Sequence, residues 1–281
     1  MQSYSDNLFC LLQKMLPQHT LSRLIGKLAE AKSPWLKNLL IQQAIRTYNI
    51  DLSIAERDRP EQYLNFNDFF TRSLKPGARP ICTQKSAVIS PADGILSQFG
   101  PISNDRLIQA KGHDYTTERL LGDNHPLAEE FSNGSFATIY LAPSDYHRVH
   151  MPWAGKLLET HYIPGKLFSV NQATATGISE LFAKNERLIC VFETNRGKMA
   201  VIFVGAMLVA GIETCWQSYF PPATHASVKF SSQTIHFERA AELGRFKFGS
   251  TVILLFNESL VFDERLTSGD KILMGESLTQ Q

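Results

Sequence analysis

The sequence lacks several features that would assign it quickly to a class of protein. It contains no run of 18 or more apolar residues, so a conventional membrane-spanning helix is not expected. Its four cysteines form no Cys-x-x-Cys pair, which argues against the usual zinc and thioredoxin-like sites. The first 30 residues lack a basic segment before an apolar stretch, so no secretory signal peptide is expected. We therefore expect a protein with reduced cysteines on the cytoplasmic side.

An excess of charge of one sign is also missing. The 28 Lys and Arg residues nearly balance the 27 Asp and Glu residues, which leaves a formal net charge of +1. Whole-molecule attraction to phosphates is therefore weak, and no nucleic-acid partner is expected. No His-Glu-x-x-His motif is present, and no metal site is predicted. With 43% hydrophobic residues, the chain should fold as one large domain or two small ones.

Residues 1–50 show apolar side chains at helical spacing, with a break at Pro17 and a new helix start at Ser33-Pro34. This pattern predicts three short amphipathic helices. The region carries six basic and two acidic residues, a local balance of 6 − 2 = +4. A basic amphipathic region is typical of helices that lie in the interface of an anionic membrane. The pattern alone fits equally well a helical layer packed on the core.

From about residue 80 the sequence changes to short β-rich runs separated by Gly, Pro, Asn and Asp. The uncharged segment 199–212 fits two buried strands joined at a turn better than one helix. Segments 117–121 and 178–183 fit helical turns, so the predicted fold class is α+β. We expect amphipathic helices in a region spanning residues 1–75, followed by a mainly antiparallel β domain over residues 76–281. The expected strands cover residues 135–141, 188–192, 199–204, 207–212 and 251–256.

Three short motifs contain residues that could carry chemistry, and each also has an ordinary structural reading. Ser250 follows a glycine at the start of an apolar strand. It could act as a nucleophile, or it could be a turn serine that only hydrogen-bonds the backbone. His147 and His150 lie just beyond a predicted strand end. They fit either functional histidines or ordinary surface or core histidines. Asp93 precedes Gly94, a pair typical of a hairpin turn, although its carboxylate could instead orient a histidine. The Gly-x-Ser-x-Gly motif of α/β-hydrolases is absent from the sequence.

Taken together, these and other motifs occur in an order that is specific. The set consists of Phe66-Asn67-Asp68-Phe69-Phe70-Thr71-Arg72, Arg79-Pro80, Pro91-Ala92-Asp93-Gly94, Lys111-Gly112-His113, Tyr146-His147-Arg148-Val149-His150-Met151-Pro152, Gly165-Lys166-Leu167-Phe168-Ser169-Val170-Asn171, Asn185-Glu186-Arg187 and Gly249-Ser250-Thr251. In the order and the residues of its motifs, the sequence resembles the phosphatidylserine decarboxylase family, in particular its bacterial membrane-associated branch. The family's processing signature is usually Leu-Gly-Ser-Thr, and this chain has Phe248 at the first position.

The resemblance implies a proenzyme that cleaves itself between Gly249 and Ser250. Asp93, His150 and Ser250 match the family's self-cleavage triad. In such a triad His150, oriented by Asp93, takes the hydroxyl proton of Ser250, whose oxygen attacks the Gly249 carbonyl. The resulting ester eliminates, and hydrolysis leaves a pyruvoyl group at position 250 and releases ammonia. The expected products are a β chain of residues 1–249 and an α chain of residues 250–281, which should stay associated.

The resemblance further implies that this pyruvoyl group, derived from Ser250, is the only cofactor. It would form a Schiff base with phosphatidylserine and release carbon dioxide to give phosphatidylethanolamine, an activity of phospholipid biosynthesis. His147 is the candidate for assisting that second reaction. A phospholipid substrate favours a peripheral location on the cytoplasmic side of the cell membrane, at an anionic surface. By the same resemblance we expect a homodimer.

Two alternatives remain open at the level of the sequence. In the first, the protein is a Ser-His-Asp hydrolase or autoprotease in which Ser250 stays a hydroxyl nucleophile. In the second, it is a membrane-peripheral β domain that no longer processes itself. The first requires an intact Ser250 in the mature chain and the second a single uncut chain, whereas the pyruvoyl mechanism requires two chains and a converted Ser250.

Overall fold

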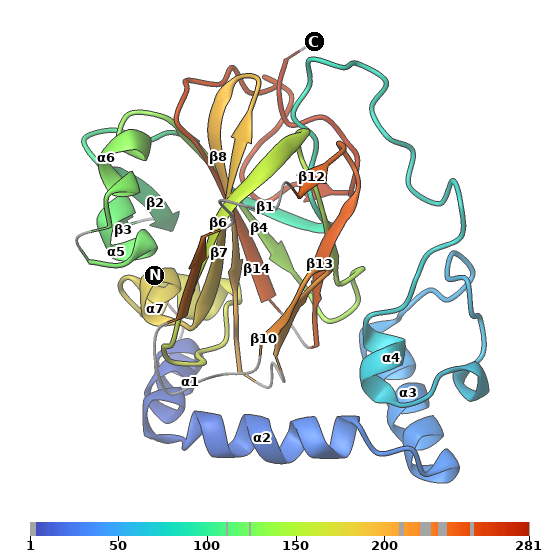
Figure 1. Ribbon diagram of the computed structural model, residues 1–281. Helices are drawn as coiled ribbons and strands as arrows, with labels where there is room; N and C mark the ends of the chain where they lie inside the picture. Colours follow the sequence, from blue (N-terminus) through green and yellow to red (C-terminus); the bar gives the residue numbers. More distant parts are fainter. Residues whose placement is uncertain are drawn as a thin grey trace.

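The computed structural model describes residues 4–110, 112–123, 125–207, 211–219, 226–229, 235–247 and 250–280. A β-rich part contains two packed sheets, and a helical part from the N-terminal region lies along its lower end and beside it (Figure 1). The mixture of helices with a large antiparallel sheet confirms the predicted α+β class.

The first three helices are α1 (Tyr4–Met15), α2 (Gln18–Ala29) and α3 (Pro34–Tyr48). They confirm the helices predicted from apolar spacing, including the break at Pro17 and the start at Pro34. A 3-10 turn, η1 (Pro60–Gln62), and the short helix α4 (Phe66–Phe70) follow. In Figure 1, α2 runs crosswise beneath the β-rich part, from α1 at one side to α3 and α4 at the other. No helix in the described ranges is long and apolar enough to cross a membrane.

The main sheet joins strands from most of the chain after residue 93. Its order is β11-β6-β7-β8-β14-β4-β1-β15, with β12 also paired to β6, and its neighbouring strands are antiparallel. The strands are β1 (Gly94–Pro101), β4 (Ser135–Leu141), β6 (Gly155–Ile163), β7 (Arg187–Thr194), β8 (Gly197–Val204), β11 (Ala226–Lys229), β12 (His236–Phe237), β14 (Ser250–Phe256) and β15 (Lys271–Ile272).

A smaller antiparallel sheet packs on one face of the main sheet, and helices cover the other. The smaller sheet has the order β10-β9-β13-β5, and β2 pairs with β3 in a separate ribbon. The elements are β2 (Arg106–Ala110), β3 (His113–Thr116), α5 (Thr117–Leu121), α6 (Leu127–Phe131), β5 (Arg148–His150), α7 (Gln172–Gly177), α8 (Leu181–Lys184), β9 (Ile212–Thr214), β10 (Ser218–Tyr219) and β13 (Glu242–Phe246).

The continuous apolar run of β14 is explained by burial on both faces. Val252 and Leu254 belong to the core shared with the smaller sheet, whereas Ile253 and Leu255 belong to the core under the helices. Because β14 lies between β8 and β4, both of its edges are also hydrogen-bonded. A strand segment buried on two faces favours apolar residues on both, which is what the sequence shows from Val252 to Phe256.

Three local expectations differ from the structure. Asp93-Gly94 does not form a hairpin turn: Ile89 bridges to Ser277, and Gly94 starts β1, which pairs with β15. A chain segment nearly two hundred residues away thus takes the place of the expected local partner. In the predicted strand 207–212, Met207 lies in a turn and β9 begins only at Ile212, while residues 208–210 lie outside the described residues. The helical turn expected at 178–183 begins at Leu181.

Candidate active site

Ser250 lies at the start of the central strand, where two chain connections meet. It is the first residue of β14 and pairs with Leu141, the last residue of β4. Its side chain is fully buried, and its Oγ has no hydrogen-bond partner among the described residues. A buried hydroxyl without a partner costs free energy, typically about 1–3 kcal/mol, so its presence needs an explanation. Gly249 and Phe248 lie outside the described residues.

His147 lies in the connection between β4 and β5, shortly after Leu141, which pairs with Ser250. Its backbone carbonyl accepts a hydrogen bond from the Phe246 N–H at 3.1 Å. Two connecting segments therefore meet at both ends: Leu141 lies beside Ser250, and His147 lies beside Phe246. The sequence predicts a strand end beside each of these two residues, and the pairing of β4 with β14 brings those ends together.

The imidazole of His147 is held in one tautomer and kept neutral. It is fully buried, and its Nδ1–H donates to the Asp145 carbonyl at 2.9 Å. Its ring centroid lies 4.1 Å from that of Phe70, on α4. Burial lowers the pKa of His147 to about 3. Its Nε2 carries a lone pair at neutral pH and has no partner in the described part of the chain.

His150 ends β5 and is also prepared to act as a base. Its Nδ1–H donates to the Ala240 carbonyl at 2.8 Å, so Nε2 carries the lone pair and accepts from the Tyr146 hydroxyl at 3.0 Å. Burial lowers the pKa of His150 below its ordinary value, and the bond to Ala240 only partly offsets this effect. The side chain is thus a neutral imidazole at neutral pH.

Asp93 lies close to this group but bonds to other residues. Its carboxylate accepts from Arg79 Nε at 2.8 and 3.0 Å, and from the Met274 N–H at 2.9 Å. The His150 N–H donates to the Pro91 carbonyl at 2.7 Å, which sets β5 beside the Asp93 segment. In the structure, the carbonyl of Ala240 fixes the tautomer of His150. The orienting role of Asp93 stays a prediction.

Two residues of this group carry contacts that sequence reasoning missed. Arg79 holds Asp93 with a nearly buried ion pair, and Tyr146 caps the lone pair of His150. Both stand in motifs quoted for the resemblance, but nothing in their spacing indicates which side chains they contact. Tyr146 could have been suggested by its position four residues before His150.

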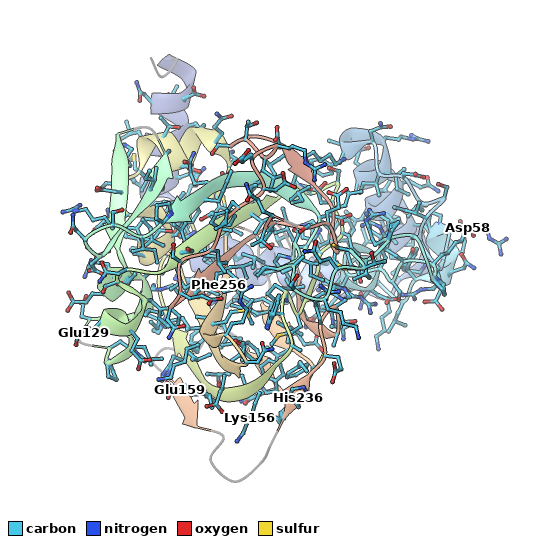
Figure 2. The ribbon with its side chains drawn as sticks, turned by 90° about the horizontal axis from the view of Figure 1, so that it is seen from above. Asp58, Glu129, Lys156, Glu159, His236 and Phe256 are labelled. Carbon is cyan, nitrogen blue, oxygen red and sulfur yellow. The ribbon has the colours of Figure 1, made fainter. Side chains whose placement is uncertain are left out.

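The described residues contain one group of side chains that could hold a metal ion. The ligand atoms of His125, Glu159 and His161 all lie within 4.8 Å of one another. Glu159 and His161 stand opposite Val191 and Ile189, which belong to the core under the helices. They therefore lie on the other face of the main sheet from Ser250. Figure 2 shows Glu159 on the side of the molecule away from Asp58 and the helical part.

Nearly the whole chain is similar to proteins of one family. The family model for phosphatidylserine decarboxylase matches residues 66–280, and a model described as PSD matches residues 8–49. Relatives named phosphatidylserine decarboxylase proenzyme come from Pseudomonas aeruginosa strain LESB58, at 49% identity over 98% of each chain, and from Stutzerimonas stutzeri strain A1501, at 48% over 98% of this chain and 95% of the relative. A third, from Alcanivorax borkumensis strain SK2, is 50% identical over 96% of this chain and 94% of its own. This chain belongs to the phosphatidylserine decarboxylase family.

Proposed function

We propose that this protein is a phosphatidylserine decarboxylase proenzyme that cleaves itself before Ser250. The observation that carries the proposal is the buried, unpartnered hydroxyl of Ser250 at the junction that also holds the unpartnered Nε2 of His147. A structural serine or histidine at such a place would be expected to have a hydrogen-bond partner. Reactive groups are found without one because the reaction itself uses the free atoms.

For self-cleavage, the geometry supplies a neutral base. The Nε2 of His150 carries a lone pair because Ala240 holds the proton on Nδ1. This nitrogen accepts the proton of the Ser250 hydroxyl after the hydrogen bond from the Tyr146 hydroxyl has broken. The Ser250 oxygen then attacks the Gly249 carbonyl, and the Gly249–Ser250 peptide bond breaks as an ester forms. Asp93, fixed by Arg79, places negative charge near this imidazole and favours its protonated form.

Position 250 suits a pyruvoyl group made from serine. The group is small and uncharged, and the Ser250 side chain occupies a fully buried site with no hydrogen-bond partner that conversion would break. When present, its ketone supplies an electrophile and electron sink that no protein side chain provides. Around it, His147 presents a neutral Nε2 that can accept a hydrogen bond from the substrate or position it. We therefore keep His147 as the candidate for assisting the decarboxylation.

The two chains of the mature protein should stay together without a peptide bond. Strand β14, which begins the 250–281 chain, lies between β8 and β4 and is buried along its whole length. Farther along the same chain, β15 pairs with β1. Removing this chain would expose both cores of the β-rich part. A homodimer of such two-chain units is the expected assembly.

Membrane association is supported by the orientation of α2. Its buried residues are Gln18, Ser22, Gly26 and Ala29, which are polar or small. Leu24 and Leu28 face outward instead, with Leu24 61% exposed. An amphipathic helix packed only for folding would bury its leucines. The outward apolar set continues over all three helices and consists of Leu8, Phe9, Leu11, Leu12, Met15, Leu16, Leu24, Leu28, Trp35 and Leu39. We infer that this apolar outer face rests on an anionic bilayer.

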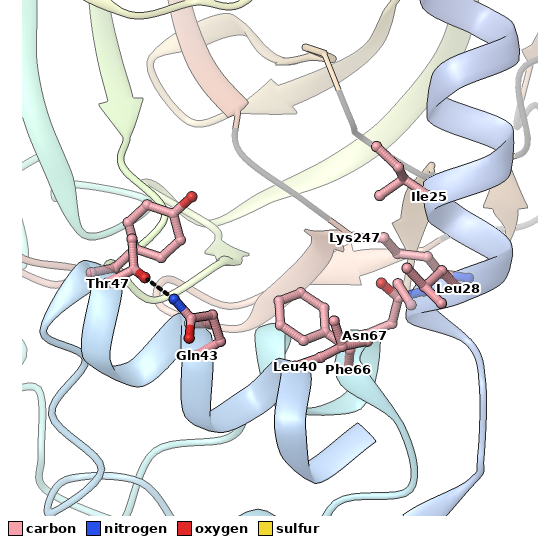
Figure 3. A pocket seen from close by; sticks show the side chains of 11 residues that line it. Ile25, Leu28, Leu40, Gln43, Thr47, Phe66, Asn67 and Lys247 are labelled. Carbon is pink, nitrogen blue, oxygen red and sulfur yellow. Dashed lines mark hydrogen bonds between the residues drawn. The ribbon is translucent and has the colours of Figure 1, made fainter. Parts of the chain in front are cut away.

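An apolar cavity lies among these helices. Its volume is about 230 Å³, and Figure 3 shows it between Ile25 and Leu28 of α2, Leu40 of α3 and Phe66 of α4. Lys247, two residues before Gly249, also lines it. A phospholipid could therefore keep an acyl chain among the helices while its head group reaches Ser250. This cavity favours a lipid over a water-soluble amino acid as substrate.

The function is tested with the purified full-length chain and vesicles of phosphatidylserine and phosphatidylglycerol. The wild-type protein should release carbon dioxide and form phosphatidylethanolamine. Ser250→Ala should remain one uncut chain and form no product, because it removes the attacking hydroxyl. Persistence of either reaction in this variant would refute the proposal. Ester hydrolysis by an uncut wild-type chain would instead identify a serine hydrolase.

A further inference from the structure

Glu186 and Ser250 lie in one row across the main sheet, at the ends of neighbouring interior strands. Arg187 and Thr251 both lie opposite Val204 of β8, from its two sides. One residue farther toward the end of the strands, the next row contains the residue before Arg187, the residue after Val204 and the residue before Thr251. The Gly205 N–H donates a hydrogen bond to the Glu186 carbonyl at 2.9 Å, in agreement with this row. The row therefore runs Glu186, Gly205, Ser250, with one residue between the acid and the serine.

The side chains of this row face the same side. Directly opposite residues of a sheet project from one face. Leu141, which pairs with Ser250, and Leu188, two residues after Glu186, both belong to the core beneath the smaller sheet. Glu186 and Ser250 thus share the face of the main sheet on which the smaller sheet packs.

The carboxyl group of Glu186 leans over Gly205, toward Ser250. A Cβ atom placed on Gly205 would come within 2.8 Å of Glu186 Cγ and 2.9 Å of its Oε1. The side chain therefore occupies the space that any other residue at 205 would fill. Neighbouring strands lie about 4.8 Å apart, so the carboxyl over β8 is roughly one strand spacing from β14.

Glu186 has the properties of a neutral acid. It is 1% exposed and accepts a hydrogen bond from the Tyr162 hydroxyl at 3.0 Å, and no ion pair forms with it among the described residues. Burial raises the pKa of Glu186 to about 7. The histidines of the site are poor proton donors by comparison, since burial lowers the pKa of both His147 and His150. A proton is thus available on the carboxyl at neutral pH.

We propose that Glu186 is a further catalytic residue, the acid that returns a proton to the substrate carbon after carbon dioxide has left. This role rests on the proposed function. The carbon loses its bond to the carboxylate, keeps that electron pair, and gains one bond to the proton of the Glu186 carboxyl. The carboxylate that remains recovers a proton from solvent after product release. Each turnover consumes one proton in total, as decarboxylation of a carboxylate requires.

The test uses Glu186→Gln, which keeps the shape of the side chain and its acceptor oxygen for Tyr162 but cannot give up a proton. We expect normal cleavage into chains 1–249 and 250–281 and a fall of about 10²–10⁴ in the rate of phosphatidylethanolamine formation. The second readout is the mass of the 250–281 chain after turnover. Without the acid, the substrate nitrogen should stay at position 250, so that this chain gains an amino group and a hydrogen in place of its ketone oxygen while the lipid leaves as an aldehyde.

Two further variants make the test specific. Gly205→Ala places a methyl group against the carboxyl and should cause the same gain in mass while Glu186 is still present. Glu193→Gln, an exposed acid on the same strand, is the matched control and should behave like the wild type. Wild-type rates and an unchanged mass in Glu186→Gln would overturn the proposal, and so would a folded Glu186→Gln chain that stays uncut. Failure of the proposed function is distinguishable, because the wild type itself would then stay uncut or inactive.

Discussion

His150 is neutral at neutral pH because it is buried, and this neutrality is what self-cleavage requires of it. Its environment contains opposing effects: Glu242 and Asp93 favour the charged form, whereas burial and Arg148 disfavour it. Burial is the largest of these, so the pKa of His150 lies below the ordinary value of 6.5. The base form is thus present over a wider range of acidic pH than in an exposed histidine.

The rate of self-cleavage should therefore fall on acidification and reach half of its maximum at a pH below 6.5. The sign follows from the chemistry, since protonation removes the lone pair that accepts the Ser250 proton. The measurement is the rate at which the 250–281 chain appears in freshly synthesised protein at each pH. A half-maximal rate at or above pH 6.5 would show that His150 is not the base, or that its burial has no effect.

Asp93 joins the chemistry to stability through Arg79. The Asp93 carboxylate is 3% exposed and the Arg79 side chain 11%, so the pair is almost fully removed from water. Removing one partner of such a pair leaves an uncompensated charge, which costs about 3–5 kcal/mol. The residue should thus matter for folding stability as well as for cleavage.

We predict that Asp93→Asn stays folded but uncut, with a lower free energy of unfolding. Denaturant titration of the uncut chain measures the stability, and denaturing electrophoresis measures cleavage. Asp263→Asn is the control, because its partner Arg265 is 78% exposed and little stability should be lost. Rapid, complete cleavage of Asp93→Asn would contradict the role of Asp93.

At this scale the sequence indicates candidate reactive residues, but it does not indicate their contacts. Asp93, His147, His150 and Ser250 could be selected from the motifs that surround them, and the structure places them in neighbouring segments. Their hydrogen-bond partners come from distant positions, such as Ala240 for His150. Such partners depend on how strands pair in space, and a single sequence carries no local signal for that pairing.

Among the elements, α2 shows most clearly how apolar spacing predicts a helix without predicting what it contacts. The spacing of its leucines correctly predicted the helix, and it left the membrane and the core as equal alternatives. The structure places small and polar residues against the rest of the molecule and Leu24 and Leu28 outside. That choice depends on the shape of the surface onto which the helix packs, which the sequence of the helix does not contain.

Replacing outward leucines should weaken membrane binding without affecting folding. Leu12→Glu with Leu24→Glu changes two side chains that are 52% and 61% exposed. Each leucine contributes about 1.5 kcal/mol or more when buried, so we expect binding to phosphatidylglycerol vesicles to fall more than tenfold. Vesicle sedimentation measures binding, and self-cleavage of the double variant should be normal.

Ile108→Glu provides the control for this experiment. Ile108 is 54% exposed but lies on β2, away from the three helices. The same change of an exposed apolar residue to an acid should leave vesicle binding intact there. Equal loss of binding in both proteins would argue for a general effect of charge, and the helical face would then have no special role.

Over the whole molecule, the two cores and the central strand explain how a chain can be cut and remain one protein. The cut is expected before the first residue of β14, and all seven residues of that strand are buried between β8 and β4. Figure 2 shows Phe256, the last residue of the strand, within the body of the molecule. The α+β class and the antiparallel sheet were predictable from composition and alternation. The order of the strands was not, because it joins segments nearly two hundred residues apart, such as β1 and β15.

The most direct test of the account is the intact mass of the purified protein under denaturing conditions, with and without reduction of carbonyl groups. We predict two chains, residues 1–249 and 250–281, with the smaller one blocked at its N-terminus and carrying a ketone that reduction converts to an alcohol. A single chain of full mass, with an unmodified Ser250, would contradict the central claim that this serine becomes the reactive group.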